Sequence, residues 1–433
     1  MTARPNIILF ITHDQGQFLG CYDTSQTPNS LHTPNLDNLA KDGIRFTNYF
    51  CTAPQCSPSR GSIQTSLYPH QNGLMGLVNR GWTLPNHNKT IPMYLRDAGY
   101  STHLIGLQHE TKDVETLGYD SYSKRMKDYK YDTKRMFKEY ESFLEDHKND
   151  EKPFYLNIGT IEIHRPFVKW SQPGDMYSVK VPPFLPDNDE IREDLRLFYG
   201  IINPLDKVIG NLIEVLENTG LREDTLFIFT TDHGSPFPRA KCTLYDPGIK
   251  TLLVMNWPKS RLFSSGRVFD QMISNIDLLP TLLDIVGSEH PQYIEGKSFL
   301  PILKDPKLPF RQEIFTEKNF HEIYDPIRSI RTQKYKFIKN FEKYDKLYQI
   351  PIDIERGLSG QYIKDKIELE RPEEEFYDLE EDPNEINNLI LNSAHNAFVA
   401  ELRQELLEWM KKTNDPILKG KISSQKKPEI EKQ

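Results

Sequence analysis

The sequence predicts an α/β fold with a large, mostly parallel central sheet. Four short apolar segments, rich in branched residues, have the length and composition of buried strands, and helical patterns separate them along the chain. Strands that alternate with helices favour a parallel sheet covered by helices on both faces. The strand candidates are Asn6–Thr12, Ser101–Gly106, Phe154–Gly159 and Thr225–Thr231.

Two helical segments carry clear signals. Thr33–Gly43 has a threonine in the N-cap position, Pro34 at the first helical position and a glycine at its end. Asp189–Asn218 contains a long amphipathic stretch, and Pro204 within it predicts a bend or a division of the helix.

The composition changes after about residue 310, where alternating patterns rich in Lys and Tyr begin. We expect residues 1–310 to form a catalytic domain, 311–418 a smaller α+β domain with an antiparallel sheet, and 419–433 a flexible tail with almost no apolar residues. The C-terminal elements expected are strands at Ile327–Arg331, Tyr335–Asn340 and Phe376–Leu379, and a helix at Ala394–Lys412.

Composition and charge exclude several classes of protein. The chain has 433 residues, of which 37% are hydrophobic, and its net charge is −8, from 54 Lys+Arg and 62 Asp+Glu. This balance, without a basic stripe, disfavours nucleic-acid binding. No apolar run reaches about 18 residues, so no membrane span is expected. The four cysteines form no CxxC pair. The short apolar run near the N-terminus does not resemble a signal peptide, which predicts a cytoplasmic protein. The oligomeric state is not indicated.

Polar residues follow three of the predicted strands directly or within three residues. They are His13-Asp14, His109 and Asp232-His233. Because the carboxyl ends of parallel strands meet at one edge of a sheet, we expect these residues to surround a ligand site.

The segment Cys56-Ser57-Pro58-Ser59-Arg60, followed by Gly61, is the sharpest local motif. Taken alone, it is equally well a loop cysteine before a proline turn. In context it resembles the signature of the type I sulfatases. Further stretches resemble the same family in the same order: Asn6–Gly16, Tyr68–Gly73, Thr230–Gly234, Phe376–Leu379 and Glu381–Glu385. Within the family, His70–Gly73, Ser235–Pro238, Thr243–Tyr245, Pro247–Gly248 and Pro326–Ser329 resemble the heparan N-sulfoglucosamine sulfohydrolase (sulfamidase) branch.

The resemblance implies an alkaline-phosphatase-like sandwich and a known chemistry. A maturation enzyme would convert Cys56 to formylglycine (3-oxoalanine). One hydroxyl of its hydrate would attack sulfur, and the second would then lose its proton, which re-forms the aldehyde and expels sulfate. A divalent metal would lower the pKa of the hydrate and neutralise the sulfate oxygens.

Site residues are transferred from the family motifs position by position. The implied metal ligands are Asp14, Cys56, Asp232 and His233, with His13 as a further ligand or as a neighbour of the ligands. The family resemblance implies calcium, whereas two histidines suit manganese or zinc better. The remaining implied residues are Arg60 beside the hydrate, His109 near the nucleophile, His164 as proton donor to the leaving group, Lys241 for sulfate, and His321 and Glu322 for the sugar.

Two positions depart from the family pattern. His13 stands where the family usually has aspartate, and Leu107 replaces the lysine that contacts sulfate. Lys112, Arg80 or Arg165 are the candidates to supply the missing charge. The sequence therefore predicts hydrolysis of a sulfate ester or sulfamate on a sugar, with a glycosaminoglycan (heparan-type) fragment as substrate. A phosphonate monoester hydrolase or phosphodiesterase, and a non-catalytic binding protein, remain the alternatives.

Overall fold

A computed structural model describes residues 4–24, 29–123, 133–169, 171–367 and 370–425 of the chain. Its larger sheet has nine strands in the order β4-β3-β5-β1-β6-β7-β2-β8, with β9 also paired to β2. All pairings are parallel except those of β7 with β6 and with β2. The strands are β1 (Asn6–Thr12), β2 (Ile44–Phe50), β3 (Ser101–Gly106), β4 (Ser121–Tyr122), β5 (Phe154–Gly159), β6 (Thr225–Thr231), β7 (Lys250–Asn256), β8 (Arg267–Phe269) and β9 (Ile273–Ser274). The mostly parallel α/β fold is confirmed, and β1, β3, β5 and β6 have the predicted bounds.

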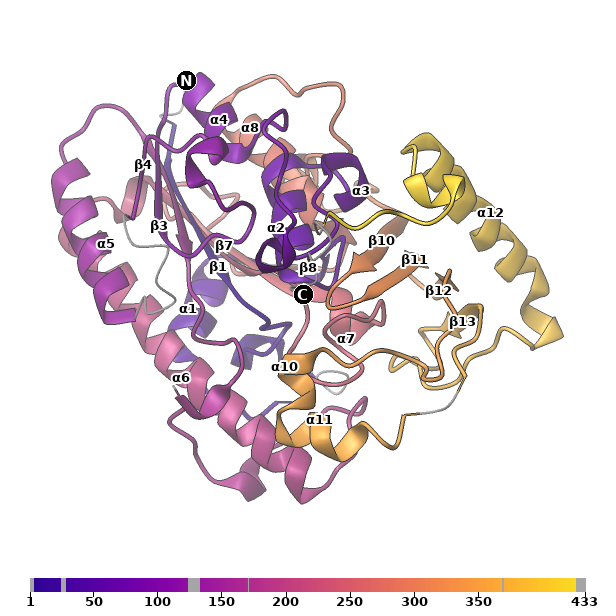
Figure 1. Ribbon diagram of the computed structural model, residues 1–433. Helices are drawn as coiled ribbons and strands as arrows, with labels where there is room; N and C mark the ends of the chain where they lie inside the picture. Colours follow the sequence, from indigo (N-terminus) through magenta and orange to yellow (C-terminus); the bar gives the residue numbers. More distant parts are fainter. Residues whose placement is uncertain (1–3, 25–28, 124–132, 170, 368–369, 426–433) are drawn as a thin grey trace, which may run out of the picture.

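Helices cover both faces of this sheet (Figure 1). On one face lie α1 (Pro34–Asp42), α5 (Thr133–His147) and α6 (Asp189–Asn218). On the other lie α2 (Cys56–Thr65), α4 (Ile91–Asp97) and α8 (Leu278–Val286). The short helices are α3 (Pro69–Asn72), α7 (Asp246–Ile249), α9 (Leu300–Lys304), α10 (Ile352–Glu355) and α11 (Leu358–Ile363).

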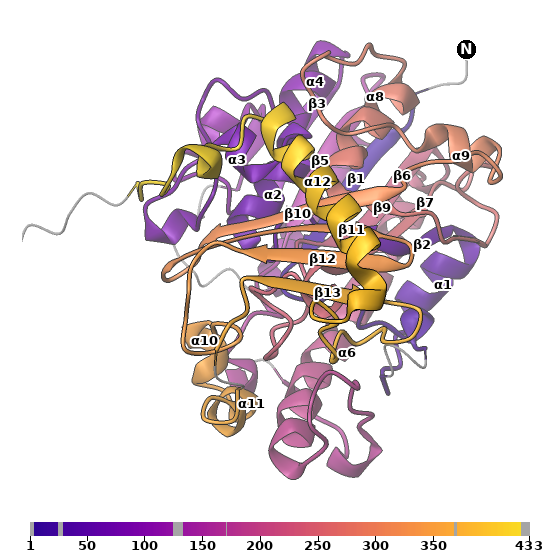
Figure 2. The same ribbon diagram turned by 90° about the vertical axis from the view of Figure 1, so that its right-hand side faces the viewer.

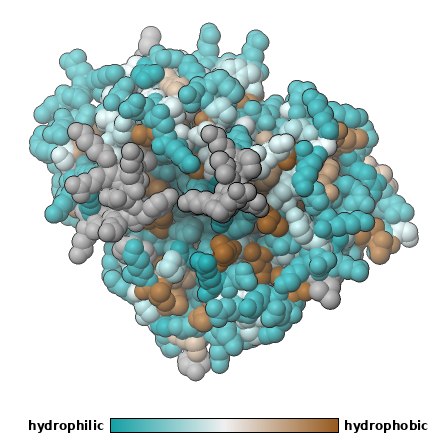
Figure 3. Space-filling view, in the orientation of Figure 1, coloured by the Kyte–Doolittle hydropathy of each residue, from teal (hydrophilic) through white to brown (hydrophobic). Residues whose placement is uncertain are grey.

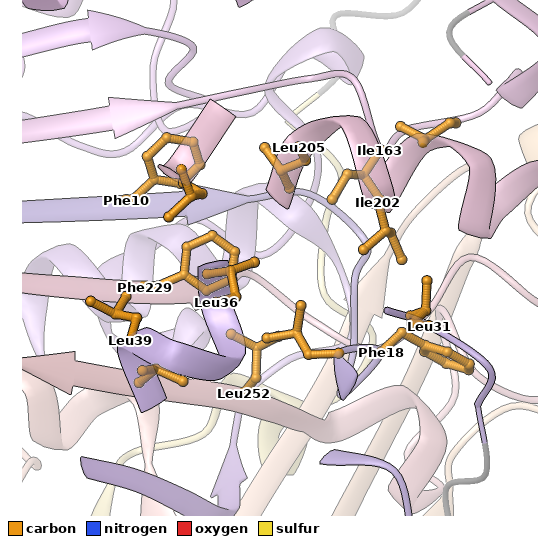
Figure 4. Packing of buried hydrophobic residues seen from close by; sticks show 14 of the residues in the cluster. Phe10, Phe18, Leu31, Leu36, Leu39, Ile163, Ile202, Leu205, Phe229 and Leu252 are labelled. Carbon is orange, nitrogen blue, oxygen red and sulfur yellow. The ribbon is translucent and has the colours of Figure 1, made fainter. Parts of the chain in front are cut away.

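Successive residues of the central strands point to the two different cores. Ile8 and Phe10 of β1 belong to the core beneath α6, whereas Ile7 and Leu9 belong to the opposite core. Figure 4 shows the first of these cores, with Phe10 near the side chains of α6 and of the neighbouring α1. Each fully buried side chain of this size contributes roughly 1.5–3 kcal/mol of burial free energy. Both faces of β1 are apolar because both are covered.

A second, antiparallel sheet has the order β10-β11-β12-β13. Its strands are β10 (Glu313–Phe320), β11 (Tyr324–Thr332), β12 (Tyr335–Asn340) and β13 (Glu374–Asp378), and the long helix α12 (Asn396–Lys412) lies across it (Figure 2). Antiparallel strands and a C-terminal helix were predicted here. The domain boundary at 310 stays a prediction, and residues 426–433 of the predicted tail lie outside the described residues. Within the described part of the chain, no helix has both the length and the apolar character that crossing a bilayer requires.

Thr33 occupies the predicted N-cap position of α1, but the capping hydrogen bonds come from elsewhere. The Thr33 side chain makes no capping bond to α1, and instead Asp206 of α6 accepts hydrogen bonds from the backbone N–H groups of Asn35 (3.2 Å) and Leu36 (2.8 Å). A carboxylate from another helix therefore caps α1. α6 is one helix of 30 residues with Pro204 inside it, so of the two predicted outcomes, a bend or a division, the division is excluded.

Candidate functional site

The two aspartates that follow β1 and β6 lie against each other. The Asp14 backbone N–H donates to Asp232 Oδ1 at 3.0 Å, and both carboxylates are fully buried. Asp14 has a φ of 49°, in the left-handed region that aspartate tolerates better than most residues. The adjacent, parallel positions of β1 and β6 bring these loops together, as the sequence predicted from strand ends.

Cys56 is the first residue of α2 and faces these loops. Its Sγ lies 3.6 Å from Asp14 Oδ1 and 3.3 Å from His233 Nε2. All ten residues of α2 are buried, although the helix is largely polar. Burial and the neighbouring Asp14 and Asp232 carboxylates raise the pKa of the Cys56 thiol well above its ordinary value. The thiol is therefore protonated at neutral pH.

Arg60 lies one turn along α2 and ties the helix to both aspartate loops. Its Nε donates to Asp232 Oδ2 at 3.0 Å, and a terminal nitrogen donates to the Thr12 carbonyl at 2.9 Å. Ser59 adds a hydrogen bond to the Asp232 carbonyl. These bonds fix the direction of α2, so that its N-terminal end points at the aspartates.

Lys241 is buried and lies between two carboxylates. Its Nζ donates to Asp14 Oδ2 at 2.7 Å and to Asp353 Oδ2 at 2.8 Å. Burial alone would lower the pKa of Lys241, but these two carboxylates raise it well above its usual range. His164 Nε2 approaches the same two carboxylates, at 3.9 Å from Asp14 and 3.7 Å from Asp353.

Asp353, from the short helix α10, was missed by sequence reasoning. It lies 112 residues beyond Lys241, and its surroundings match no motif. Burial would raise the pKa of its carboxyl, but Lys241 and His164 lower it to about 2. A second group of possible metal ligands consists of Asp14, His164 and Asp353. The Lys241 ammonium, however, already binds both of its carboxylates. A cation of the chain itself therefore neutralises this second group.

A first group of possible ligands consists of His13, Asp14, Cys56 and Asp232. All four are buried, and each offers one ligand atom within 4.8 Å of the others. In the described part of the chain neither ring nitrogen of His13 has a hydrogen-bond partner, although Nδ1 lies 3.1 Å from Asp232 Oδ2. Burial and the Arg60 charge lower the pKa of His13 well below its ordinary value, which keeps the ring neutral and able to bind metal. Two carboxylates and an imidazole without a partner fit a divalent cation.

His233 was also predicted as a ligand but lies outside this group. Its Nδ1 faces the Gly234 carbonyl at 2.9 Å, and its Nε2 lies 2.9 Å from Asp14 Oδ1. Burial alone would lower the pKa of His233, but Asp232 and Asp14 raise it. In this arrangement His233 orients the Asp14 carboxylate beside Cys56.

His109 lies near His13, with ring centroids 5.9 Å apart. The Gln108 side chain shapes its loop by accepting from the backbone N–H groups of Glu110 (2.8 Å) and Thr111 (3.1 Å). Burial and the Arg60 charge lower the pKa of His109 to about 4. The loop after β3 therefore joins the loops after β1 and β6.

A cavity of about 1010 Å³ opens over these histidines and is lined by His13, Leu107, His109, Lys112 and His164, among others. The face of the molecule seen in Figure 3 is largely hydrophilic and is hollowed near its middle, in the region where α2 and α10 lie in Figure 1. Leu107 and Lys112 thus share one cavity. Within the described residues, Lys112 has no hydrogen bond or ion pair.

The other two candidates for the missing charge are already paired. Arg165 is buried and binds both oxygens of Asp194, at 3.0 and 2.7 Å. Arg80 is partly exposed and lies 3.7 Å from Glu322. Of the three cations considered, Lys112 is the one that remains free to meet an anion in the cavity.

His321 and Glu322 hydrogen-bond to each other and line a neighbouring cavity. Glu322 also accepts from the backbone N–H of Ile352, the residue before Asp353, at 3.3 Å. The structure therefore brings both residues next to α10, beside the polar group around Lys241.

Comparisons with known proteins identify the family of this chain. Residues 5–288 match the family model described as Sulfatase, and residues 239–356 match that described as N-sulphoglucosamine sulphohydrolase, C-terminal. An ulvan-active sulfatase of Formosa agariphila is 30% identical over 98% of this chain and 83% of its own length. The human N-sulphoglucosamine sulphohydrolase is 28% identical over 98% of this chain and 95% of its own.

The fold is also similar to that of a phosphonate monoester hydrolase from Silicibacter pomeroyi. The TM-score is 0.73 with 19% identity, over 95% of this chain and 96% of that one. At this identity the likeness concerns the fold, and it agrees with the alkaline-phosphatase-like architecture that was predicted. Since the Sulfatase model spans well over half of the chain, the chain belongs to the sulfatase family of sulfuric ester hydrolases.

Proposed function

We propose that this protein is a formylglycine-dependent sulfatase that removes sulfate ester or sulfamate groups from sugars, with heparan-type fragments as substrates. The observation that carries the proposal is the position of Cys56. It begins a buried helix, with Sγ 3.6 Å from Asp14 and 3.3 Å from His233, and Arg60 of the same helix binds Asp232.

The names of the relatives support the substrate class. The Formosa agariphila relative is named for ulvan and the human relative for N-sulphoglucosamine, and each aligns with nearly all of this chain. The C-terminal match to the N-sulphoglucosamine sulphohydrolase model favours the heparan-type sugar over the others. His321 and Glu322, beside α10, would contact that sugar.

The formylglycine hydrate made from Cys56 by a maturation enzyme would supply the attacking hydroxyl and, with its second hydroxyl, the means to release sulfate. His13, Asp14, Asp232 and residue 56 would hold a divalent metal that neutralises sulfate oxygens. Calcium follows from the family, whereas the free imidazole of His13 favours manganese or zinc.

The chain's own groups have separate tasks in this proposal. Arg60 holds Asp232 in place, and Lys241 balances the charges of Asp14 and Asp353. His164 lies on the cavity side of these carboxylates with its side chain 30% exposed, so it can reach the leaving group and donate a proton to it. His109, also in the cavity, lies beside His13 and would bind a sulfate oxygen.

The test combines mass spectrometry with sulfate release. The peptide that contains residue 56 should have the mass of 3-oxoalanine, and Cys56→Ala should abolish sulfate release from N-sulfoglucosamine. Cys21→Ala, which changes a cysteine that forms no part of this site, should keep full activity. A Cys56→Ala variant with wild-type activity would refute the mechanism.

A phosphonate monoester hydrolase is the second candidate, because Leu107 removes a sulfate-binding cation and a protein of that kind shares the fold. Parallel assays with aryl sulfate and aryl phosphonate esters separate the two functions. Faster release from the phosphonate would favour the second candidate.

A further inference from the structure

A separate cavity of about 290 Å³ lies beside the segments that follow Asp14 and His233, and it is distinct from the cavity over His13 and His109. Gly16 and Ser235 form part of its wall, two residues beyond Asp14 and His233 respectively, and Lys250 and Arg331 lie in the wall formed by the two sheets. It has no lining residue in common with the cavity over His13 and His109. Its volume is near the lower limit for small-molecule sites.

Lys250 is the surplus cation of a charged cluster in this wall. Asp246 accepts from Arg331 at 2.9 Å and from Lys336 at 2.6 Å, and Lys336 also pairs with Glu385 at 2.6 Å. Two cations thus satisfy two carboxylates. Within the described chain, nothing accepts a hydrogen bond from Lys250 Nζ, and burial, which outweighs the opposing effect of Asp246, lowers its pKa to about 8. The side chain remains mostly charged at neutral pH without a partner.

Ser235 provides a second, independent sign of a ligand. The residue is only 1% exposed, lines the cavity, and its Oγ has no hydrogen-bond partner among the described residues. A buried hydroxyl without a partner costs free energy, which a ligand oxygen would recover. Lys250, whose ammonium group has no partner among the described residues, and Ser235, whose buried hydroxyl has none there either, therefore belong to the wall of the same small cavity.

The rest of the wall limits the kind of ligand. Phe18 and Phe184 add apolar atoms to the wall, and Asp246 and Glu380 place carboxylates in it. Asp246 is already paired with Arg331 and Lys336, and Glu380 with Lys334. The free ammonium of Lys250 therefore balances one negative charge on a ligand, and a second charge would have no free cation among the described lining residues to balance it.

We propose that this cavity is a second, non-catalytic site for a small ring-bearing monoanion, whose carboxylate or sulfate-type group is bound by Lys250 and Ser235 and whose ring packs on Phe18 and Phe184. The ligand contacts the segments that continue from Asp14 and His233, so occupancy of the site would stabilise both loops. The inference rests on the cavity and not on the proposed catalytic function.

The test measures binding to the full-length protein by titration calorimetry in slightly alkaline buffer. The probes are benzoate and benzenesulfonate as monoanions, phenylphosphonate as a dianion and benzamide as a neutral analogue. Both monoanions should bind, whereas the dianion and benzamide should bind at least about tenfold more weakly. Comparison of the two monoanions shows whether the site prefers a carboxylate or a sulfonate.

Variants assign the binding to this cavity. Lys250→Met should weaken monoanion binding by about tenfold or more, since a charge-assisted hydrogen bond is lost. Lys250→Arg should retain binding within about threefold, and Lys112→Met, in the catalytic cavity, should leave it unchanged. Acylation of Lys250 by an amine-directed reagent, followed by peptide mass spectrometry, should slow when benzoate is present. Four results would each overturn the proposal. They are benzamide binding as tight as that of the monoanions, full monoanion binding by a folded Lys250→Met variant, loss of monoanion binding in Lys112→Met, and acylation of Lys250 at the same rate with and without benzoate.

Discussion

Single residues decide the charge of the catalytic site. Compared with the pattern expected from the family, His13 removes one negative charge and Leu107 removes one positive charge. Both lie in the same cavity wall, so the two departures compensate each other in net charge. The charge is nevertheless redistributed, because the proposed metal group has one carboxylate fewer, and the cavity one cation fewer, than the family pattern.

Lys112 is expected to replace the missing cation. A charge-assisted contact in a transition state is worth about 2–4 kcal/mol, or roughly 30- to 1000-fold in rate, and solvent screening of the exposed Lys112 favours the lower end. Lys112→Ala should therefore lower kcat/KM for sulfated substrates by roughly 30-fold, measured as sulfate release. Lys259→Ala, which removes a surface lysine paired with Asp224, should change little. Leu107→Lys should give little gain, and a large gain would contradict compensation by Lys112.

Asp232 is expected to be indispensable for metal binding. Asp232→Ala removes one of the carboxylates of the four-residue group and leaves Arg60 without its partner, so the protein should lose both metal and activity. The measurement is metal content per chain by elemental analysis. Asp353→Asn is the matched control, because Asp353 lies outside that group, and it should retain the metal. Stoichiometric metal in a folded Asp232→Ala protein would rule the site out.

At the scale of elements, the most informative case is α2. Its residues show no amphipathic pattern because both sides of the helix are buried, and polar partners replace apolar contacts. Ser57 accepts from the backbone N–H of Val78, Ser59 and Arg60 bind the loop of Asp232, and the Thr65 hydroxyl bonds within the helix. Hydrophobic periodicity could not have predicted this helix, since it records one-sided burial.

The contact between β3 and α5 makes stability depend on pH. The ring centroid of His103 lies 4.7 Å from that of Phe143 and 4.9 Å from that of His147, and burial and His147 lower the pKa of His103 to about 4. Since the unfolded histidine titrates near 6.5, the unfolded state binds a proton first, and stability falls as the pH drops from about 6.5 to about 4.

His103→Gln should therefore reduce this acid-induced loss, by about 1–2 kcal/mol after allowance for partial solvent screening. Urea unfolding of wild type and variant at a series of pH values measures the effect. The exposed His87→Gln is the control and should follow wild type. Parallel pH curves for His103→Gln and wild type would contradict the assigned cause.

At the scale of the whole molecule, the two sheets share a hydrophobic core. Phe50 and Ile249 from the large sheet region pack in one cluster with Ile314, Ile327 and Ile338 of the small sheet. Lys241 and Asp353 likewise join the two parts within the catalytic site. The C-terminal part therefore completes both the core and the site.

We accordingly expect the full chain to unfold in one cooperative transition. A fragment of residues 1–310 would expose the apolar surface around Phe50 and Ile249 and should fail to form a stable monomer. Calorimetry of the full chain and size-exclusion chromatography of the fragment test this. A monodisperse fragment with native near-ultraviolet circular dichroism would show instead that the part before residue 310 folds on its own.

The sequence by itself determined the main strands, their alternation with helices and the polar residues that follow them. The bounds of β1, β3, β5 and β6 were predictable because a buried strand needs an uninterrupted apolar run, and the residues after parallel strands must meet at one edge. Only the tertiary structure decided that Asp206 caps α1, that Asp353 shares Lys241 with Asp14, and that Lys250 has no partner among the residues the structure describes. Local patterns record which side of an element is buried, whereas these contacts join residues 112 to 227 positions apart and depend on how finished elements pack.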